Sequence, residues 1–213
     1  MEDGIELKDL KVPTESDGRF PIVLEATRKI CSTLGDKNAI YGFITGPFTL
    51  ALHLKGTDIF YEMMDETEKI KELMSFCQEV CVNTARMYME AGVDVIAVVD
   101  PMVSQISPGN FEEFVSPYII PLFEYIKENE KLSSYFVCGN ATRNIEPMCK
   151  CKPDSKNVAL DFAKGICSKY GIFLGASGTL DGIDVKLPDY KNQPKVIIDV
   201  ITLDSASCDM PVL

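Results

Sequence analysis

Two hydrophobic patterns alternate along this chain. Stretches with apolar residues at every third or fourth position predict amphipathic helices. These stretches are residues 20–34, 65–91, 110–129, 144–151 and 158–170. Short continuous apolar runs between them predict strands that are covered on both faces. These runs are residues 39–45, 94–100, 134–138, 171–175 and 196–203.

Strands that alternate with helices predict an α/β protein with a parallel sheet built from right-handed crossovers. An open doubly wound sheet and a (β/α)8 barrel both fit this order. A barrel takes about 250 residues, whereas this chain has 213. About five recognisable strands and this length favour an open sheet, or else a barrel from which part is missing. No repeat or clear domain boundary interrupts residues 1–213.

Composition and charge narrow the class of protein. The chain is 46% hydrophobic and 25% charged, which is typical of a globular domain and excludes disorder. Its formal net charge is −11, and no cluster of Lys and Arg interleaved with aromatic residues suits a phosphate backbone. We therefore predict no nucleic-acid partner. The absence of a leader pattern and of an apolar run of about 18 residues predicts a soluble, cytoplasmic protein without a membrane partner.

Polar residues follow the predicted strands at the edge where ligands bind in both architectures. Gly46 and Thr49 follow the first strand, Asp100 ends the second, and Asn140 follows the third. We predict that all four bind the substrate. Asp100 is the candidate catalytic residue, as a general base or a hydrogen-bond acceptor, and the alternative is a cap that faces water.

Two of the eight cysteines, Cys138 and Cys208, follow predicted strands. A pair of thiolates that converge from two strands is typical of a soft-metal site, most often for zinc. The other cysteines fall at apolar helix positions or at a helix end, which favours packing. They are Cys31, Cys77, Cys81, Cys149, Cys151 and Cys167. Cys149 and Cys151, with one residue between them where zinc pairs usually have two or more, stay in reserve as a metal pair.

The single histidine and the glycine-rich turns argue against other enzyme classes. His53 lies between leucines on a predicted helix, which indicates a packed or surface residue. Without a second histidine, a His-based nucleophile triad is hard to build. The turns match neither the dinucleotide fingerprint nor the P-loop pattern, so nucleotide binding loses its main support.

Several stretches together resemble the uroporphyrinogen decarboxylase superfamily, and within it the corrinoid-dependent methyltransferases. They are LKVPTESDGRFPIVLEATRKI, ITGPFTLALHLKG, AGVDVIAVVDPMVSQISPGNFEEFVSPYIIPLF, FVCGNATRNIEPM and LDSASCDMP. The resemblance runs in family order across most of the chain and implies a (β/α)8 barrel with its site at the carboxyl end. It begins partway into the family pattern. Residues 1–213 are therefore expected to form one barrel domain of this type, without the opening strands and the final helix.

The resemblance also implies a metal site and a methyl donor. In the methyltransferase branch, zinc is held by a His-x-Cys pair and by a later cysteine, and Cys138 and Cys208 match the two cysteines. Phe136 stands at the histidine position and cannot coordinate a metal. Water, substrate or another side chain must then fill two tetrahedral positions. Zinc would lower the pKa of a bound small thiol, and the thiolate would attack the methyl group of a methylcorrinoid carried by a corrinoid protein.

Three interpretations of function stay open at this point. The first is a zinc-assisted methyltransferase that moves a methyl group from a methylated corrinoid to a thiol. The second is a non-catalytic family member or partner subunit, which Phe136 and the shortened barrel favour. The third is a uroporphyrinogen decarboxylase-like protein without a metal, or a remnant without activity. A shortened barrel exposes strand edges, so we expect a partner chain or a homo-oligomer to cover them.

Overall fold

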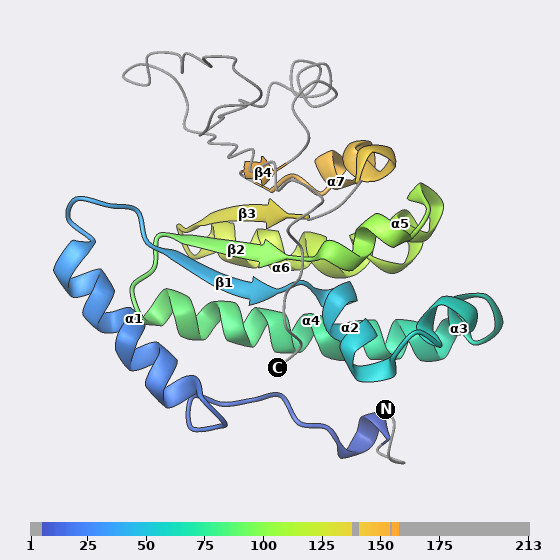
Figure 1. Cartoon of the computed structure of the whole chain (residues 1–213), viewed down its shortest axis with the longest axis horizontal. Coiled ribbons are helices and arrows are strands. Elements are labelled where there is room, and N and C mark those ends of the chain that lie inside the picture. The colour runs from blue at the N-terminus through green and yellow to red at the C-terminus, as the bar shows by residue number, and fades with distance from the viewer. Residues whose placement is uncertain (1–5, 138–140, 154, 158–213) are drawn as a thin grey trace, which may run out of the picture.

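A parallel sheet with helices along one face organises the chain (Figure 1). The computed structural model describes residues 6–137, 141–153 and 155–157. The four strands of this part lie in the order β1-β2-β3-β4, and every neighbouring pair is parallel. They are β1 (Tyr41–Thr45), β2 (Val95–Val99), β3 (Leu132–Phe136) and β4 (Ser155–Asn157). This sequential order, without a switch point, is that of a barrel wall.

Helices and 3-10 turns connect the strands. The helices are α1 (Phe20–Leu34), α2 (Pro47–Lys55), α3 (Ile59–Asp65), α4 (Thr67–Glu90), α5 (Pro108–Phe114), α6 (Ser116–Glu128) and α7 (Ile145–Lys150). The 3-10 turns are η1 (Leu7–Asp9), η2 (Pro101–Gln105) and η3 (Thr142–Asn144). Within the described residues, no helix combines the length and the apolar character that crossing a membrane requires.

Most of the predicted elements in this part of the chain are confirmed. The helices predicted over 20–34, 65–91 and 144–151 are α1, α4 and α7, and the first three predicted strands are β1, β2 and β3. The strands predicted over 171–175 and 196–203 and the helix over 158–170 lie outside the described residues.

One predicted helix is wrong in its extent. The helix predicted over 110–129 is two helices, α5 and α6, which are divided at Val115. Pro117 lies in the first turn of α6. Its ring has no N–H to donate to the preceding turn, so the first helix ends and a second one starts with the proline near its N-terminus.

The core lies between the sheet and the helices α2, α4, α5 and α6. Alternate residues of the strands face it, including Ile44, Ile96, Val98 and Tyr135. Against them pack apolar side chains of α4 and α6 such as Met74, Cys77, Ile119 and Leu122.

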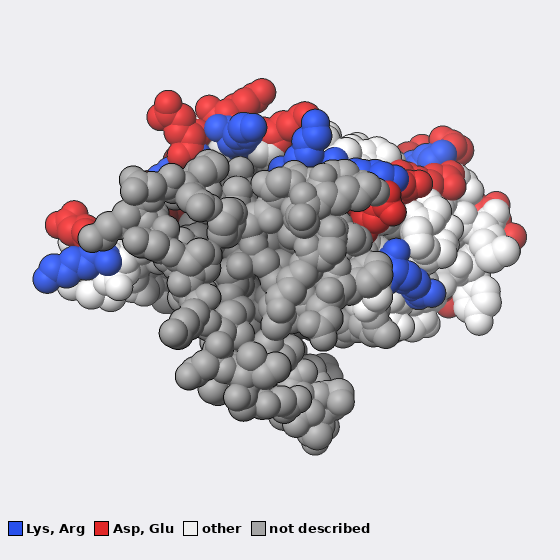
Figure 2. All heavy atoms as spheres, turned by 90° about the horizontal axis from the view of Figure 1, so that it is seen from above, with Lys and Arg blue, Asp and Glu red and all other residues white. Residues whose placement is uncertain are grey.

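Acidic and basic side chains lie side by side along one edge of the described surface (Figure 2). Because exposed ion pairs contribute about 0–1 kcal/mol each, the apolar core carries most of the stability.

Two methionines on neighbouring helices test this assignment of the core. Met74 on α4 is 0% exposed, whereas Met64 on α3 is 81% exposed. We expect Met74→Ala to lower the free energy of unfolding by about 2–5 kcal/mol, because it leaves a cavity in the core. The matched variant Met64→Ala should change it by less than about 0.5 kcal/mol. Urea denaturation of both variants measures the difference, and equal losses would contradict the assigned core.

Candidate functional site

A buried carboxylate lies where β2 ends. Asp100 is 0% exposed, and its side chain accepts hydrogen bonds from the first turn of α2. Its Oδ1 accepts from the backbone N–H of Thr49 at 2.7 Å and from the Thr49 hydroxyl at 2.5 Å. Its Oδ2 accepts a longer bond from the N–H of Phe48 at 3.4 Å. The carboxylate, which follows β2, thus caps the N-terminus of α2, which follows β1. Its charge also interacts favourably with the positive end of the helix dipole.

Gly46 makes this cap possible. It is the N-cap residue of α2, where Ser, Asp or Asn would ordinarily supply the capping oxygen. A Cβ on Gly46 would lie 2.5 Å from Oδ2 of Asp100, and closer still to the Cβ and Cγ of the same side chain. The backbone N–H of Gly46 also donates to the carbonyl of Val99 at 2.7 Å. The carboxylate of Asp100 therefore occupies the space that a side chain at position 46 would need.

Further hydrogen bonds join three strand ends at this point. The Thr49 hydroxyl accepts a bond of 3.2 Å from the N–H of Met102, which lies in η2 after β2. The N–H of Asp100 donates to the carbonyl of Phe136 at the end of β3, at 2.9 Å. The loops that follow β1 and β2 are consequently held to each other and to β3 by backbone and side-chain bonds.

Burial dominates the electrostatics of Asp100. It raises the pKa of the carboxyl from 3.8 to about 6, although the hydrogen bonds from Thr49 and Phe48 and the nearby Tyr135 hydroxyl act to lower it. Burial and the charge of Asp100 raise the pKa of Tyr135 well above its ordinary value. The Tyr135 Oη lies near the carboxylate but has no partner at hydrogen-bond geometry among the described residues. Near neutral pH, Asp100 is thus a buried carboxylate close to its own titration range.

The cysteines of α4 lie beside this carboxylate as packed thiols. Cys77 and Cys81 are buried in the core, which confirms the prediction of packing. Burial first, and then the charge of Asp100, raises the pKa of Cys77 to about 12 and that of Cys81 well above its ordinary value. The Cys81 thiol donates to the carbonyl of Thr45 at 3.1 Å. Both thiols therefore stay protonated and serve as packing groups.

The predicted site residues divide into two sets. Gly46, Thr49 and Asp100 are brought together, as described above. Asn140 and the proposed metal ligands Cys138 and Cys208 lie outside the described residues, as does Cys167. No cluster of three or more His, Cys, Asp or Glu side chains suited to a metal is present among the residues that the structure describes.

The remaining cysteines and the histidine behave as the pattern indicated. Cys149 and Cys151 are buried at the end of α7, and Cys31 on α1 is half-buried. His53 is an exposed residue of α2. These side chains take no part in the arrangement around Asp100.

Comparison with known proteins decides the family. Residues 2–169 match the sequence pattern described as uroporphyrinogen decarboxylase (URO-D). The chain belongs to the URO-D family. It is 32% identical over 152 residues to the methylcobamide:CoM methyltransferase MtbA of Methanosarcina acetivorans, which covers 70% of this chain and 44% of that protein. It is 26% identical over 201 residues to the uroporphyrinogen decarboxylase of Synechococcus sp., which covers 89% of this chain and 55% of that protein.

The fold of a solved structure agrees with the described sheet. A methyltransferase from Methanosarcina mazei superimposes with a TM-score of 0.71 at 24% identity, covering 81% of this chain and 54% of that chain. This similarity confirms the α/β fold with a parallel sheet. This chain spans about half the length of the relatives that it matches.

The sequence pattern of this URO-D-family chain did not identify Asn144 as a buried polar residue. Asn144 is 0% exposed, and its Nδ2 donates to the carbonyls of Val103 at 2.6 Å and Ile106 at 2.9 Å. It thereby ties the start of α7 to the loop after β2. Its position at the start of the predicted helix over 144–151 could have indicated a cap, but nothing in the sequence indicates bonds to Val103 and Ile106, some 40 residues earlier.

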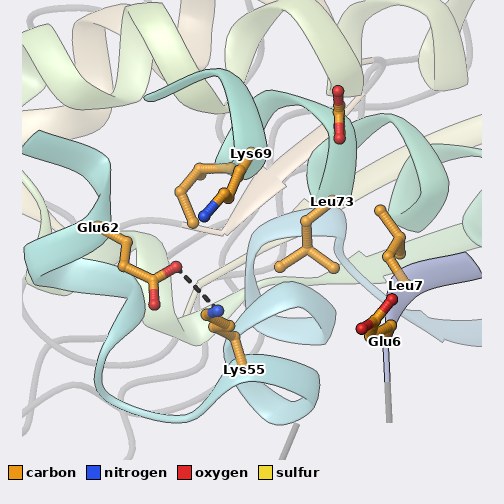
Figure 3. A pocket seen from close by; sticks show the side chains of 8 residues that line it. Glu6, Leu7, Lys55, Glu62, Lys69 and Leu73 are labelled. Atoms are coloured by element: carbon orange, nitrogen blue, oxygen red, sulfur yellow. Dashed lines mark ion pairs between the residues drawn. The ribbon is translucent and has the colours of Figure 1, made fainter. Parts of the chain in front are cut away.

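A separate pocket lies where η1 meets α2, α3 and α4 (Figure 3). Its volume is about 440 Å³, and Leu7, Ile70 and Leu73 form its apolar part. Lys55 and Glu62 form an ion pair of 2.9 Å at its side. The polar lining residues are Glu6, Lys55, Glu62, Lys69 and Glu72. Gly46, Thr49 and Asp100 do not line this pocket, so it is distinct from the strand ends around Asp100.

Replacing Gly46 tests the close approach of Asp100. We expect Gly46→Ala to lower the free energy of unfolding by about 1–3 kcal/mol, because the new methyl group overlaps the carboxylate and pushes it off the α2 cap. The matched control is Gly109→Ala in α5, where a Cβ meets nothing nearer than the Ser107 Oγ at 4.0 Å. That variant should keep or slightly raise stability. Equal effects of the two variants in thermal unfolding would contradict this account.

The raised pKa of Asp100 predicts a pH dependence of stability. Because the folded pKa of about 6 lies above the ordinary 3.8, the folded state binds this proton more tightly than the unfolded state does. The resulting stabilisation is complete below pH 3.8 and is lost as the pH rises through 6. Asparagine does not titrate. As the pH rises across this range, the free energy of unfolding of the wild type should therefore fall by up to about 3 kcal/mol relative to that of Asp100→Asn. Urea denaturation of both proteins at several pH values measures this, and parallel pH profiles would disprove it.

Proposed function

We propose that this URO-D-family chain takes part in methyl transfer from a methylcorrinoid to a small thiol. The observation that carries the proposal is the 32% identity with the methylcobamide:CoM methyltransferase MtbA over 70% of this chain. The name of that relative implies a methylated cobamide as donor and a thiol of the CoM type as acceptor. The parallel strand ends of the described sheet support it, because ligands of parallel α/β folds bind at this edge.

The described geometry supports a positioning role for Asp100. Asp100 shares the face of β2 that bears Ile96 and Val98, and this face packs on the helices. The opposite face ends in a row of Thr45, Val99 and Phe136 by strand register. Asp100 holds Thr49 and the start of α2 in place on its own side. We propose that the substrate binds on the opposite side of the strand ends, near Gly46 and Asn140.

Zinc assistance is a separate part of the proposal and depends on Cys138 and Cys208. Among the described residues the donor set does not fit zinc, because the thiols of α4 are protonated and packed and Phe136 supplies no donor. We therefore derive no step through the metal. If the two cysteines bind zinc, the ion would lower the pKa of a coordinated substrate thiol.

A second candidate function is a non-catalytic family member or partner subunit. Phe136 stands where the methyltransferase pattern has a metal-binding histidine, and the chain spans 44% of the length of MtbA. A decarboxylase-like role is the third possibility, supported by 26% identity with the Synechococcus enzyme. The experiment below separates the first candidate from both of these.

Methyl transfer can be measured directly with methylcobalamin as donor and a panel of thiols that includes CoM. We expect thiol methylation above the uncatalysed rate, together with bound zinc in anaerobically purified protein. Cys138→Ser and Cys208→Ser should each lower the rate by roughly tenfold or more and reduce the zinc content. Cys31→Ser, on the half-buried face of α1, is the matched control and should keep both. A folded wild type without transfer would refute the proposal, whereas transfer without zinc would refute only the metal's part in it.

A further inference from the structure

Two adjacent residues of η3 hold the loop after β2, which contains η2 and leads to α5. The Nδ2 of Asn144 donates to the carbonyls of Val103 and Ile106, at 2.6 Å and 2.9 Å. The guanidinium of Arg143 adds a bond of 3.3 Å to the carbonyl of Ser104. Three carbonyls of one short loop thus accept hydrogen bonds from side chains that follow β3. The loop after β2 is consequently anchored to the next strand along the sheet.

The bonds of Asn144 are buried and use only one half of its amide group. Asn144 is 0% exposed, and both hydrogens of its Nδ2 are taken by the two carbonyls. Its Oδ1 has no hydrogen-bond partner among the described residues. Because a buried acceptor without a partner costs free energy, this side chain is suited to holding the loop rather than to maximal stability. Local costs of this kind are typical of functional sites.

The same loop is held from the side of β1 as well. η2 begins directly after Asp100, and the N–H of Met102 donates to the Thr49 hydroxyl at 3.2 Å. The loop is thus fixed by Thr49 on one side and by Asn144 on the other. It lies at the carboxyl ends of the strands, where ligands of parallel α/β folds bind. Without Asn144 it would lose its two buried bonds toward β3, while the bond to Thr49 remained.

We propose that Asn144 is a positioning residue for methyl transfer, which fixes the loop after β2 and thereby shapes the binding site of the acceptor thiol. This inference rests on the proposed function. Asn144 acts through the loop and not through contact with a reactant. A displaced loop weakens binding but leaves the reacting groups in place, so loss of Asn144 should act mainly on the KM for the thiol. A side chain that only stabilised the fold would instead change the amount of active protein at constant KM.

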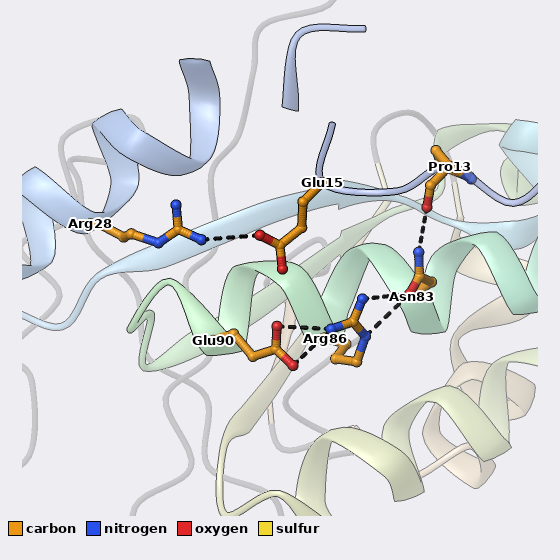
Figure 4. Close-up of polar contacts among 6 residues, drawn as sticks. All are labelled: Pro13, Glu15, Arg28, Asn83, Arg86 and Glu90. Atoms are coloured by element: carbon orange, nitrogen blue, oxygen red, sulfur yellow. Dashed lines mark hydrogen bonds and ion pairs between the residues drawn. The ribbon is translucent and has the colours of Figure 1, made fainter. Parts of the chain in front are cut away.

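Asn83 on α4 provides a matched control, because it makes the same kind of bond outside the loops that follow the strands (Figure 4). Its Nδ2 donates to the carbonyl of Pro13 at 2.5 Å, in the segment before α1. Its Oδ1 accepts two bonds from Arg86, at 3.0 Å and 3.2 Å. Asn83→Ala therefore removes a bond between an asparagine side chain and a distant carbonyl without touching η2 or η3.

Steady-state kinetics with methylcobalamin as donor and CoM as acceptor tests the proposal. Asn144→Ala should raise the KM for the thiol roughly tenfold and lower kcat by less than about threefold. Asn144→Ser keeps a hydroxyl donor at this position, so its KM should lie between those of Asn144→Ala and the wild type. Asn83→Ala should keep both constants within about twofold of the wild type. Thermal unfolding identifies the temperature range in which each variant is folded.

The amide hydrogen exchange of residues 101–106 gives a second readout that does not require activity. It should be faster in Asn144→Ala than in the wild type and in Asn83→Ala, because the loop has lost its buried bonds. Equal exchange in all three proteins would overturn the anchoring role.

The kinetic outcomes separate this inference from the function on which it rests. An unchanged KM in folded Asn144→Ala, or in Asn144→Ser where the alanine variant does not fold, would overturn the positioning role. An equal rise of KM in Asn83→Ala would overturn it as well. A wild type without methyl transfer would refute the proposed function, and with it the role of Asn144 in that reaction.

Discussion

The contact between the Asp100 carboxylate and the first turn of α2 fixes the part of the fold where a site is expected. The carboxylate arrives at the end of β2, and the N–H groups that it accepts from follow β1. The loop after β1 therefore cannot move independently of the loop after β2. Thr49 extends the arrangement to η2, and the backbone of Asp100 extends it to β3. Asp100 thus joins three strand ends, through its side chain to the residues after β1 and through its backbone to β3.

Two opposing effects decide the state of this carboxylate. Removing an isolated carboxylate from water costs several kcal/mol, and the bonds from Thr49 and Phe48 together with the helix dipole offset part of that cost. The offset is incomplete, because the pKa of Asp100 stays raised at about 6. A pKa below the ordinary value would instead indicate that the hydrogen bonds and the helix dipole outweigh the cost of burial. Asp100 is consequently a positioning group that costs some stability near neutral pH, and Gly46 is required because the carboxylate fills the space beside it.

The sequence predicted the strands that carry apolar runs, but it missed β4 and also α3, although α3 buries Ile59 and Met63. Continuous apolar runs marked β1, β2 and β3, whereas β4 has the sequence SKN and carries no such signal. Gly46-Pro47 was recognisable as a turn and Asp100 as a residue at a strand end. Their contact was not, since a cap supplied from more than 50 residues away leaves no local pattern. The buried bonds of Asn144 escaped prediction for the same reason.

The alternation of β2 separates the structural groups from those that can meet a ligand. Side chains two residues apart share a face of a strand, so Ile96, Val98 and Asp100 all point toward the helices. Thr45, Val99 and Phe136 form the last row on the other face by register. An aromatic ring in that row can present apolar surface but no metal ligand. Among the described residues, Phe136 therefore offers this row no metal donor, and Asp100 acts through the loops that it holds together.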